Sequence, residues 1–265
     1  MTSRFFGRHC LFFTCWLLSL TLLSGLKCGL AADAPKGSPP DTEAINFVRD
    51  LLKQRPAKAF ALSGVFHLRQ SDGRRSDIPI QYAVQSEAES WKSIYKAQGT
   101  SQIGAEQLVV NHLPDQANAY HFTQVSLDGT ATNTTLLLGD QAAGLPFSKS
   151  DFWLTDLGME FLHWPQQRFI RDAKITMKWG RPLRVVESVN PRPQPGRYSR
   201  VVSWIDSELG SLVKAEAYDL RGKRFKVFEL RGFDKVNGRW EVREMEIRNE
   251  ETDTRTRLEF HFDPE

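Results

Sequence analysis

Cysteine is missing from almost all of this sequence. The three cysteines of the 265-residue chain lie close to its N-terminus: Cys10, Cys15 and Cys28. Once such an N-terminal stretch is removed, no disulfide can form and no thiolate can act as a nucleophile or a metal ligand. The remaining fold must then be held together by its hydrophobic core, even in an oxidising compartment.

Long hydrophobic runs are also missing, apart from residues 11–26. The basic residues Arg4 and Arg8 precede this run, and small residues follow it at Gly29, Ala31 and Ala32. This is the layout of a secretory signal peptide, and the apolar run is short for a transmembrane helix. We therefore expect residues 1–31 to be a signal peptide that is cleaved after Ala31 or Ala32, with an uncleaved membrane anchor as the alternative.

An excess of charge of one sign is missing after the signal. The full chain has 35 Lys and Arg and 32 Asp and Glu, and three of the basic residues (Arg4, Arg8 and Lys27) belong to the signal. The mature chain is therefore formally neutral and offers no basic surface typical of nucleic-acid binding. Lys27 stands directly before Cys28, where a bacterial lipoprotein signal requires a small residue. We expect an exported, unlipidated protein of the periplasm.

Motifs for common enzyme chemistry are missing as well. There is no Gly-rich phosphate loop, no Gly-x-Ser-x-Gly elbow and no zinc-type pair of histidines. The sequence thus predicts no catalytic residue, no metal site and no cofactor. One alternative is a hydrolase that uses Asp151, Asp156 or Glu160 as paired carboxylates. The simpler interpretation is that these acids are the water-facing residues of a helix.

Short strand-like segments fill most of the remaining sequence. Apolar and polar residues alternate in them, and turn signals such as Ser71-Asp72-Gly73, Asp128-Gly129 and Asn237-Gly238 separate them. Strands joined by tight turns are antiparallel neighbours. We predict strands at residues 60–69, 78–86, 90–98, 107–111, 119–126, 134–138, 174–179, 183–189, 198–206, 211–219, 224–236, 239–249 and 255–262.

Two segments have a helical pattern. A Pro- and Gly-containing linker at residues 32–41 leads into a helix at 42–54, with Asp41 as its N-cap. Residues 150–163 carry apolar side chains on nearly every side, which predicts a helix buried on more than one face. This aromatic helix is either a plug in the core or a lid over an apolar cavity. We expect residues 42–265 to form a single domain.

The longest predicted strands contain signs of curvature. Within residues 239–249 the apolar phase shifts from Trp240 and Val242 to Met245 and Ile247. A β-bulge near Arg243-Glu244 would account for the shift, and Gly232 could act in the same way in the preceding strand. Both features would help the sheet to curl.

The C-terminal third resembles a known family through the order of its segments. These are Val185-Val186-Glu187-Ser188, Tyr198-Ser199-Arg200-Val201-Val202-Ser203-Trp204-Ile205-Asp206, Lys214-Ala215-Glu216-Ala217-Tyr218-Asp219, Gly222-Lys223, Gly238-Arg239-Trp240 and Met245-Glu246-Ile247-Arg248-Asn249. In this order they resemble the outer-membrane lipoprotein-sorting proteins, the LolA-like family of periplasmic carriers. The resemblance is best over about residues 147–262.

The resemblance implies an α+β, mainly β fold: a strongly curved antiparallel sheet that forms a half-open (unclosed) β-barrel, with helices covering its concave face. It also implies a non-enzymatic carrier that shields acyl chains of lipoproteins, or other lipids, in a hydrophobic cavity. Exposure of acyl chains to water costs about 0.8 kcal/mol per methylene. The implied partners are an inner-membrane release complex and an outer-membrane acceptor, and the expected state is a monomer.

Aromatic and leucine side chains are the candidates for lining such a cavity. The chain has seven tryptophans, which is generous for one domain, although aromatic residues also fill ordinary cores. The predicted ligand-binding residues are Phe152, Trp153, Leu157, Phe161, Trp164, Trp204 and Trp240. An envelope sensor or scaffold that uses the same fold remains an alternative to the carrier.

Overall fold

The computed structural model describes residues 41–87, 90–113, 115–170, 182–236 and 239–262. The predicted signal peptide, most of the linker, the strand at 174–179 and the Asn237-Gly238 turn lie outside these residues. The described residues belong to one compact unit, Pro39–Glu265. No helix in these ranges is both long and apolar enough to cross a membrane.

The described residues form a single antiparallel sheet of thirteen strands, in the order β6-β5-β4-β3-β2-β1-β13-β12-β11-β10-β9-β8-β7. Its strands are β1 (Phe60–Arg69), β2 (Arg75–Ser86), β3 (Trp91–Ala97), β4 (Glu106–His112), β5 (Ala119–Val125), β6 (Thr132–Leu138), β7 (Gln166–Phe169), β8 (Leu183–Val189), β9 (Arg200–Asp206), β10 (Leu212–Tyr218), β11 (Arg224–Val236), β12 (Arg239–Asn249) and β13 (Thr254–His261). Because β6 and β7 are the two edges, the sheet does not close. The unclosed, mainly β architecture is confirmed.

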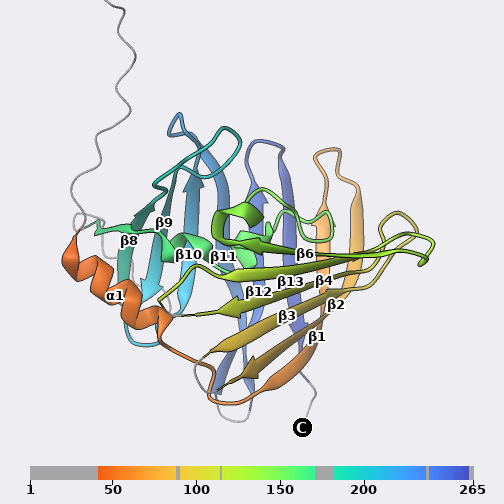
Figure 1. Cartoon of the computed structure of the whole chain (residues 1–265), viewed down its shortest axis with the longest axis horizontal. Coiled ribbons are helices and arrows are strands. Elements are labelled where there is room, and N and C mark those ends of the chain that lie inside the picture. Colours follow the sequence, from red (N-terminus) through yellow and green to blue (C-terminus); the bar gives the residue numbers. More distant parts are fainter. Residues whose placement is uncertain (1–40, 88–89, 114, 171–181, 237–238, 263–265) are drawn as a thin grey trace, which may run out of the picture. The chain divides into compact units, whose positions relative to one another are not determined.

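One long-range pairing joins the two halves of the sheet. Strand β1 pairs with β13, for example Phe66 with Leu258, so the first and last strands lie at its centre. The strands β1–β6 cross the strands β8–β12 at a steep angle, and the segment that contains helix α2 (Leu154–Leu157) lies between them (Figure 1). The pairing of β11 with β12 is irregular around Gly232, where Arg231 and Arg243 have no opposite residue. The predicted bulge is confirmed, and such bulges bend and twist a sheet.

Helix α1 (Thr42–Leu52) begins as the sequence predicts. The Asp41 side chain accepts a hydrogen bond of 2.9 Å from the backbone N–H of Glu43. The buried residues Ala44 and Val48 define its inner face. Its side chain Phe47 lies 5.5 Å from the ring of Phe169, which places the helix over the β7 edge.

The predicted aromatic helix at 150–163 is wrong as a single helix. Only one α-helical turn, α2, forms, and a 3₁₀ turn, η2 (Glu160–His163), follows it. Met159 between them has a φ of 50°, a left-handed conformation that breaks the helical path. The preceding Gly158 is also constrained, since a Cβ there would lie 2.4 Å from the Tyr120 hydroxyl. We call residues 147–164, which contain both turns, the cover segment.

The cover segment packs against both halves of the sheet, because its apolar residues point to two sides. On one side Phe147 and Phe152 lie 6.0 and 5.8 Å from the ring of Phe66 in β1. On the other side Trp153 lies 5.4 Å from the ring of Phe225 in β11. The two hydrophobic cores of the domain therefore meet at this segment.

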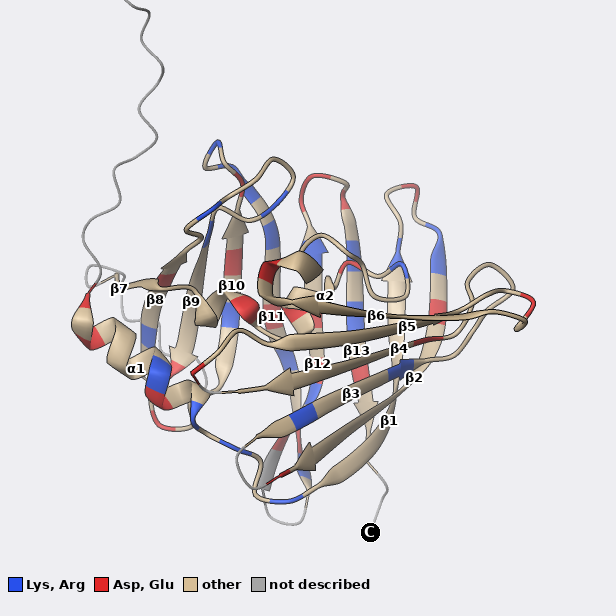
Figure 2. Cartoon of the chain, in the orientation of Figure 1, with Lys and Arg blue, Asp and Glu red and all other residues tan. Residues whose placement is uncertain are grey.

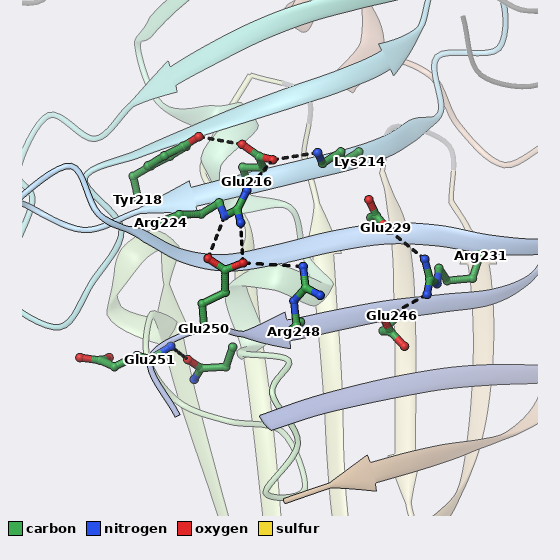
Figure 3. Close-up of polar contacts among 11 residues, drawn as sticks. Lys214, Glu216, Tyr218, Arg224, Glu229, Arg231, Glu246, Arg248, Glu250 and Glu251 are labelled. Atoms are coloured by element: carbon green, nitrogen blue, oxygen red, sulfur yellow. Dashed lines mark hydrogen bonds and ion pairs between the residues drawn. The ribbon is translucent and has the colours of Figure 1, made fainter. Parts of the chain in front are cut away.

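The outer face of the sheet, turned away from the cover segment, is charged. Lys, Arg, Asp and Glu recur along β10–β13 (Figure 2), and they pair across the strands (Figure 3). Arg231 in β11 lies 3.6 Å from Glu246 in β12, and Arg257 in β13 lies 3.6 Å from Glu244 in β12. Exposed pairs of this kind stabilise a fold by only about 0–1 kcal/mol each. Because the charged side chains lie on the outer face, the apolar side chains of these strands lie on the opposite face, which must be covered.

Replacing the N-cap by Asp41→Ala should lower the free energy of unfolding by about 1 kcal/mol, because the N–H of Glu43 loses its acceptor. The matched control is Asp50→Ala in the same helix, whose side chain is 75% exposed and 3.7 Å from Lys53. That variant should change stability by less than about 0.5 kcal/mol. Urea denaturation of both variants measures the difference, and equal losses would contradict the capping role.

Candidate ligand-binding site

A cavity of about 590 Å³ lies between the cover segment and the concave face of the sheet. Apolar side chains dominate its wall. They come from α1 (Leu51, Leu52), the cover segment (Phe152, Leu157, Phe161, Leu162) and the sheet (Tyr82, Tyr95, Val201, Ala215, Ala217, Phe228, Met245, Ile247). This volume is within the usual range of about 300–1,000 Å³ for small-molecule sites.

Three of the predicted site residues line this cavity. Phe152, Leu157 and Phe161 all come from the cover segment, and each is less than 9% exposed. Their part in ligand binding stays a prediction. The interpretation of the segment as a lid over an apolar space fits this placement, although the same side chains also fill the core.

Three of the predicted tryptophans lie outside the wall of this cavity. Trp153 stacks on Tyr198 with ring centroids 4.5 Å apart, and the indole N–H of Trp164 donates to Asp140 Oδ1 at 3.2 Å. Trp204 alternates with the inward-facing Ile205, so it lies on the outer face of β9. The side chain of Trp240 is outside the part of the chain that the structure describes.

A buried lysine connects the cover segment to the sheet. Lys226 in β11 is only 2% exposed, and its Nζ donates to the backbone carbonyl of Asp151 at 2.6 Å. The same ammonium lies 3.3 Å from Asp156 Oδ2 and 3.8 Å from the ring centroid of Trp153. Burial lowers the pKa of Lys226, and the nearby Asp156 carboxylate opposes this shift. The ammonium group is thus bonded almost entirely by the cover segment.

Sequence reasoning missed Lys226, although a signal was present. Lys226 shares one face of β11 with Phe228 and Leu230, because alternate residues of a strand point to the same side. A lysine in phase with two inward-facing apolar residues predicts a buried cation that needs an acceptor. The acceptor could not be identified from the sequence, because Asp156 is 70 residues away.

Asp151 and Asp156 form the cover side of this connection. The Asp151 carboxylate accepts hydrogen bonds from Thr254 Oγ1 at 2.5 Å and Thr256 Oγ1 at 2.9 Å, both in β13. Asp156 accepts from the Tyr198 hydroxyl at 2.9 Å and from the backbone N–H of Trp153 at 2.8 Å. The prediction that these acids face water is wrong, because they bond the cover segment to the sheet.

Glu160 is the third buried acid of the cover segment. It is 3% exposed, and its Oε2 accepts hydrogen bonds from the Tyr120 hydroxyl at 2.9 Å and the Asn118 backbone N–H at 3.3 Å. Burial raises the pKa of Glu160 to about 7, and the negative charge of Asp140 adds to this effect. Near neutral pH this carboxyl group is therefore partly protonated.

Two histidines border one end of the cavity. His112 stacks on Trp91 with ring centroids 3.7 Å apart and lies 2.9 Å from Ser93 Oγ. Burial lowers the pKa of His112 to about 3 and that of His163 to about 4, so both rings are neutral at pH 7. Within the described residues, no three His, Cys, Asp or Glu side chains form a cluster suited to a metal ion.

Lys226→Met should lower the free energy of unfolding by about 3–5 kcal/mol, because Asp156 is left buried without its cation. Lys223→Met, at the exposed turn before β11, is the matched control, and its free energy of unfolding should be close to that of the wild type. The double variant Lys226→Met, Asp156→Asn should lose less than the sum of the single changes. Urea denaturation of the wild type, both single variants, the double variant and the control measures these differences, and strict additivity would contradict the pairing.

Glu160→Gln should change how stability depends on pH. In the wild type the raised pKa of Glu160 contributes stability below pH 4.5, and this contribution is lost as the pH rises through about 7. The variant lacks this contribution, so its stability relative to the wild type should rise between pH 4.5 and 7, by on the order of 3 kcal/mol. Denaturation at pH 5, 6, 7 and 8 tests this, and a pH-independent difference would exclude it.

Comparison with known proteins supports the architecture. Residues 131–262 match a family model that is described only as an uncharacterized protein, and no curated protein matches the sequence. A domain described as an outer membrane lipoprotein-sorting protein from Vibrio parahaemolyticus has a TM-score of 0.63 at 15% identity, over 84% of this chain and 94% of that one.

Two further solved structures give the same result. A DUF1329 family protein from Desulfovibrio piger has a TM-score of 0.65 at 12% identity, over 84% of this chain and 92% of that one. A LolA superfamily protein from Nitrosomonas europaea has a TM-score of 0.54 at 12% identity, over 85% and 93%. At these identities the similarity establishes the fold, and the chain therefore has the LolA-like fold of the outer-membrane lipoprotein-sorting proteins.

Proposed function

We propose that this protein is a periplasmic carrier that binds acyl chains of lipoproteins, or of other lipids, in its apolar cavity. The observation that supports the proposal best is the 590 Å³ space beneath the cover segment, with its aliphatic and aromatic wall. Each methylene that such a space removes from water contributes about 0.8 kcal/mol. A hydrocarbon chain is the ligand that gains most from these surroundings.

The polar groups of the domain are compatible with an acyl ligand. Lys226 and Asp156 border the cavity, but their hydrogen bonds are made to the cover segment and to the sheet. The two histidines at its end are neutral at pH 7, as their lowered pKa values require. The wall therefore presents little uncompensated charge to an apolar chain.

Entry of a chain is best supported at the end of α1. Leu51 and Leu52 of this helix border the cavity together with Leu209, which is 55% exposed in the turn between β9 and β10. Exposed apolar side chains at a cavity rim are typical of ligand-binding grooves. Partial detachment of α1 would widen this opening without disturbing the centre of the sheet.

The setting of the carrier follows from the N-terminal sequence. A signal peptide at residues 1–31 would deliver the mature chain to the periplasm, where a domain without cysteine cannot form wrong disulfides. A lipoprotein carrier needs a donor and an acceptor for its ligand. We expect an inner-membrane release complex and an outer-membrane acceptor in these roles, with the carrier as a monomer.

Met245→Glu should weaken binding of a fluorescent fatty acid at least tenfold. Met245 is half-buried on the cavity wall, and a carboxylate there has no partner to offset its desolvation. Leu136→Glu, at a 55% exposed position on edge strand β6, is the control and should bind as the wild type does. Thermal unfolding monitored by circular dichroism shows whether each variant is folded.

An apolar substitution distinguishes the effect of a smaller cavity from the effect of a charge in its wall. Ala217→Phe adds bulk to the wall without charge and should shorten the longest fatty acid that binds. Native mass spectrometry of lipid retained by the purified proteins completes the test. A folded Met245→Glu protein that keeps wild-type amounts of lipid would overturn the assignment of the cavity.

A further inference from the structure

A second hollow in the domain is more polar than the apolar cavity. This cleft of about 680 Å³ is bordered by the cover segment, by the 3₁₀ turn η1 (Gly139–Ala142) and by the loop at residues 190–197. Its wall contains two arginines, Arg192 and Arg197, and three carboxylates, from Asp140, Asp156 and Glu160. Side chains of both charges therefore surround a space large enough for a small ligand.

The two arginines are available to an anion. Neither forms an ion pair with any residue in the described ranges of the chain. The guanidinium carbon of Arg197 lies 5.9 Å from the Trp153 ring centroid, and its Nη1 fills the place of a side chain at Gly144, where a Cβ would be 1.0 Å away. Glycine at this position thus makes room for the guanidinium, which can bind phosphate or carboxylate through two parallel N–H groups.

The three carboxylates lie in the cover segment and η1, and the arginines in the facing loop. Asp156 is balanced by the Lys226 ammonium at 3.3 Å, and Asp140 accepts a hydrogen bond from Trp164. Burial raises the pKa of Glu160 to about 7, so this carboxyl group carries less than a full negative charge near neutral pH. The cleft therefore favours an anion at its arginine side.

The cleft and the apolar cavity share part of one wall. Asp156, Phe161 and Tyr198 border both spaces. The Tyr198 hydroxyl donates to Asp156 Oδ1 at 2.9 Å, so this hydrogen bond and the Phe161 ring belong to the wall that the two spaces share. A molecule with a hydrocarbon chain and a charged headgroup has the same division of polarity.

We propose that the cleft binds an anionic group, a phosphate or a carboxylate, through Arg192 and Arg197. In an amphiphilic ligand this group occupies the cleft while the hydrocarbon chain occupies the cavity, with Phe161 and the Tyr198–Asp156 pair at the passage. This link between the two spaces rests on the function proposed above. The arginine site itself does not depend on it.

Calorimetric titration of the mature protein with three probes tests the proposal. Lysophosphatidylglycerol has a chain and a phosphate, monoacylglycerol has only the chain, and inorganic phosphate has only the anion. The test variant is Arg192→Gln, Arg197→Gln, and the matched control is Arg221→Gln, Lys223→Gln in the exposed turn before β11, which removes the same charge and borders neither space.

The test variant should bind lysophosphatidylglycerol about tenfold more weakly or worse, because charge-assisted hydrogen bonds are lost, and monoacylglycerol as the wild type does. The control should bind both as the wild type does. Competition by millimolar inorganic phosphate would identify a free anion as a second source of the same chemistry. Arg192→Gln alone, at an exposed position, gives a folded protein if the double variant is unstable.

Equal weakening in the test and control variants would overturn the proposal, since it would show unspecific electrostatics. The proposal would also be overturned if the test variant lost binding of lysophosphatidylglycerol and of monoacylglycerol to the same extent. Failure of the carrier function has a different signature: the wild type would bind neither glycerolipid but would still bind inorganic phosphate in a manner that requires both arginines.

Discussion

A buried ammonium group decides how this domain is assembled. Lys226 stands on the inner face of β11, and a charge at that depth is tolerated only with acceptors at hydrogen-bond distance. Both of its acceptors, the carbonyl of Asp151 and the carboxylate of Asp156, belong to the cover segment. The cover segment therefore has to lie across the strands at this point. Its position defines the apolar cavity and the cleft, which both border Asp156.

The cover segment is also too small to fill the space it covers. Thirteen strands curve around it, and its residues 147–164 pack against β1 on one side and β11 on the other. Carboxylate contacts from Asp151, Asp156 and Glu160 hold the segment in place without adding apolar volume. The unfilled remainder is the apolar cavity. The same arrangement explains how a domain without disulfides can keep a stable opening in its core.

The strands were predictable because their signal is local. Alternation of apolar and polar side chains located β1, β8, β11 and β12 at their observed bounds, and the change of apolar phase near Arg243 located the bulge. The cover segment was not predictable in the same way. Its apolar residues on every side are typical of a buried helix, but they are required here because two sheet halves contact them. Strand β7 has only four residues and follows a proline, so it left no periodic pattern.

The sequence by itself determined an antiparallel, strand-rich domain, the N-terminal cap of α1, the curvature signals and the absence of thiol chemistry. Each depends on neighbouring residues or on composition. Only the tertiary structure decided which side chains line the cavity, that Trp204 faces away from it, and that Lys226 meets Asp156. It also brought Arg197 against Gly144. These outcomes depend on contacts between residues far apart in the chain, and they are fixed by the curvature of the sheet and by the need of each buried charge for a partner.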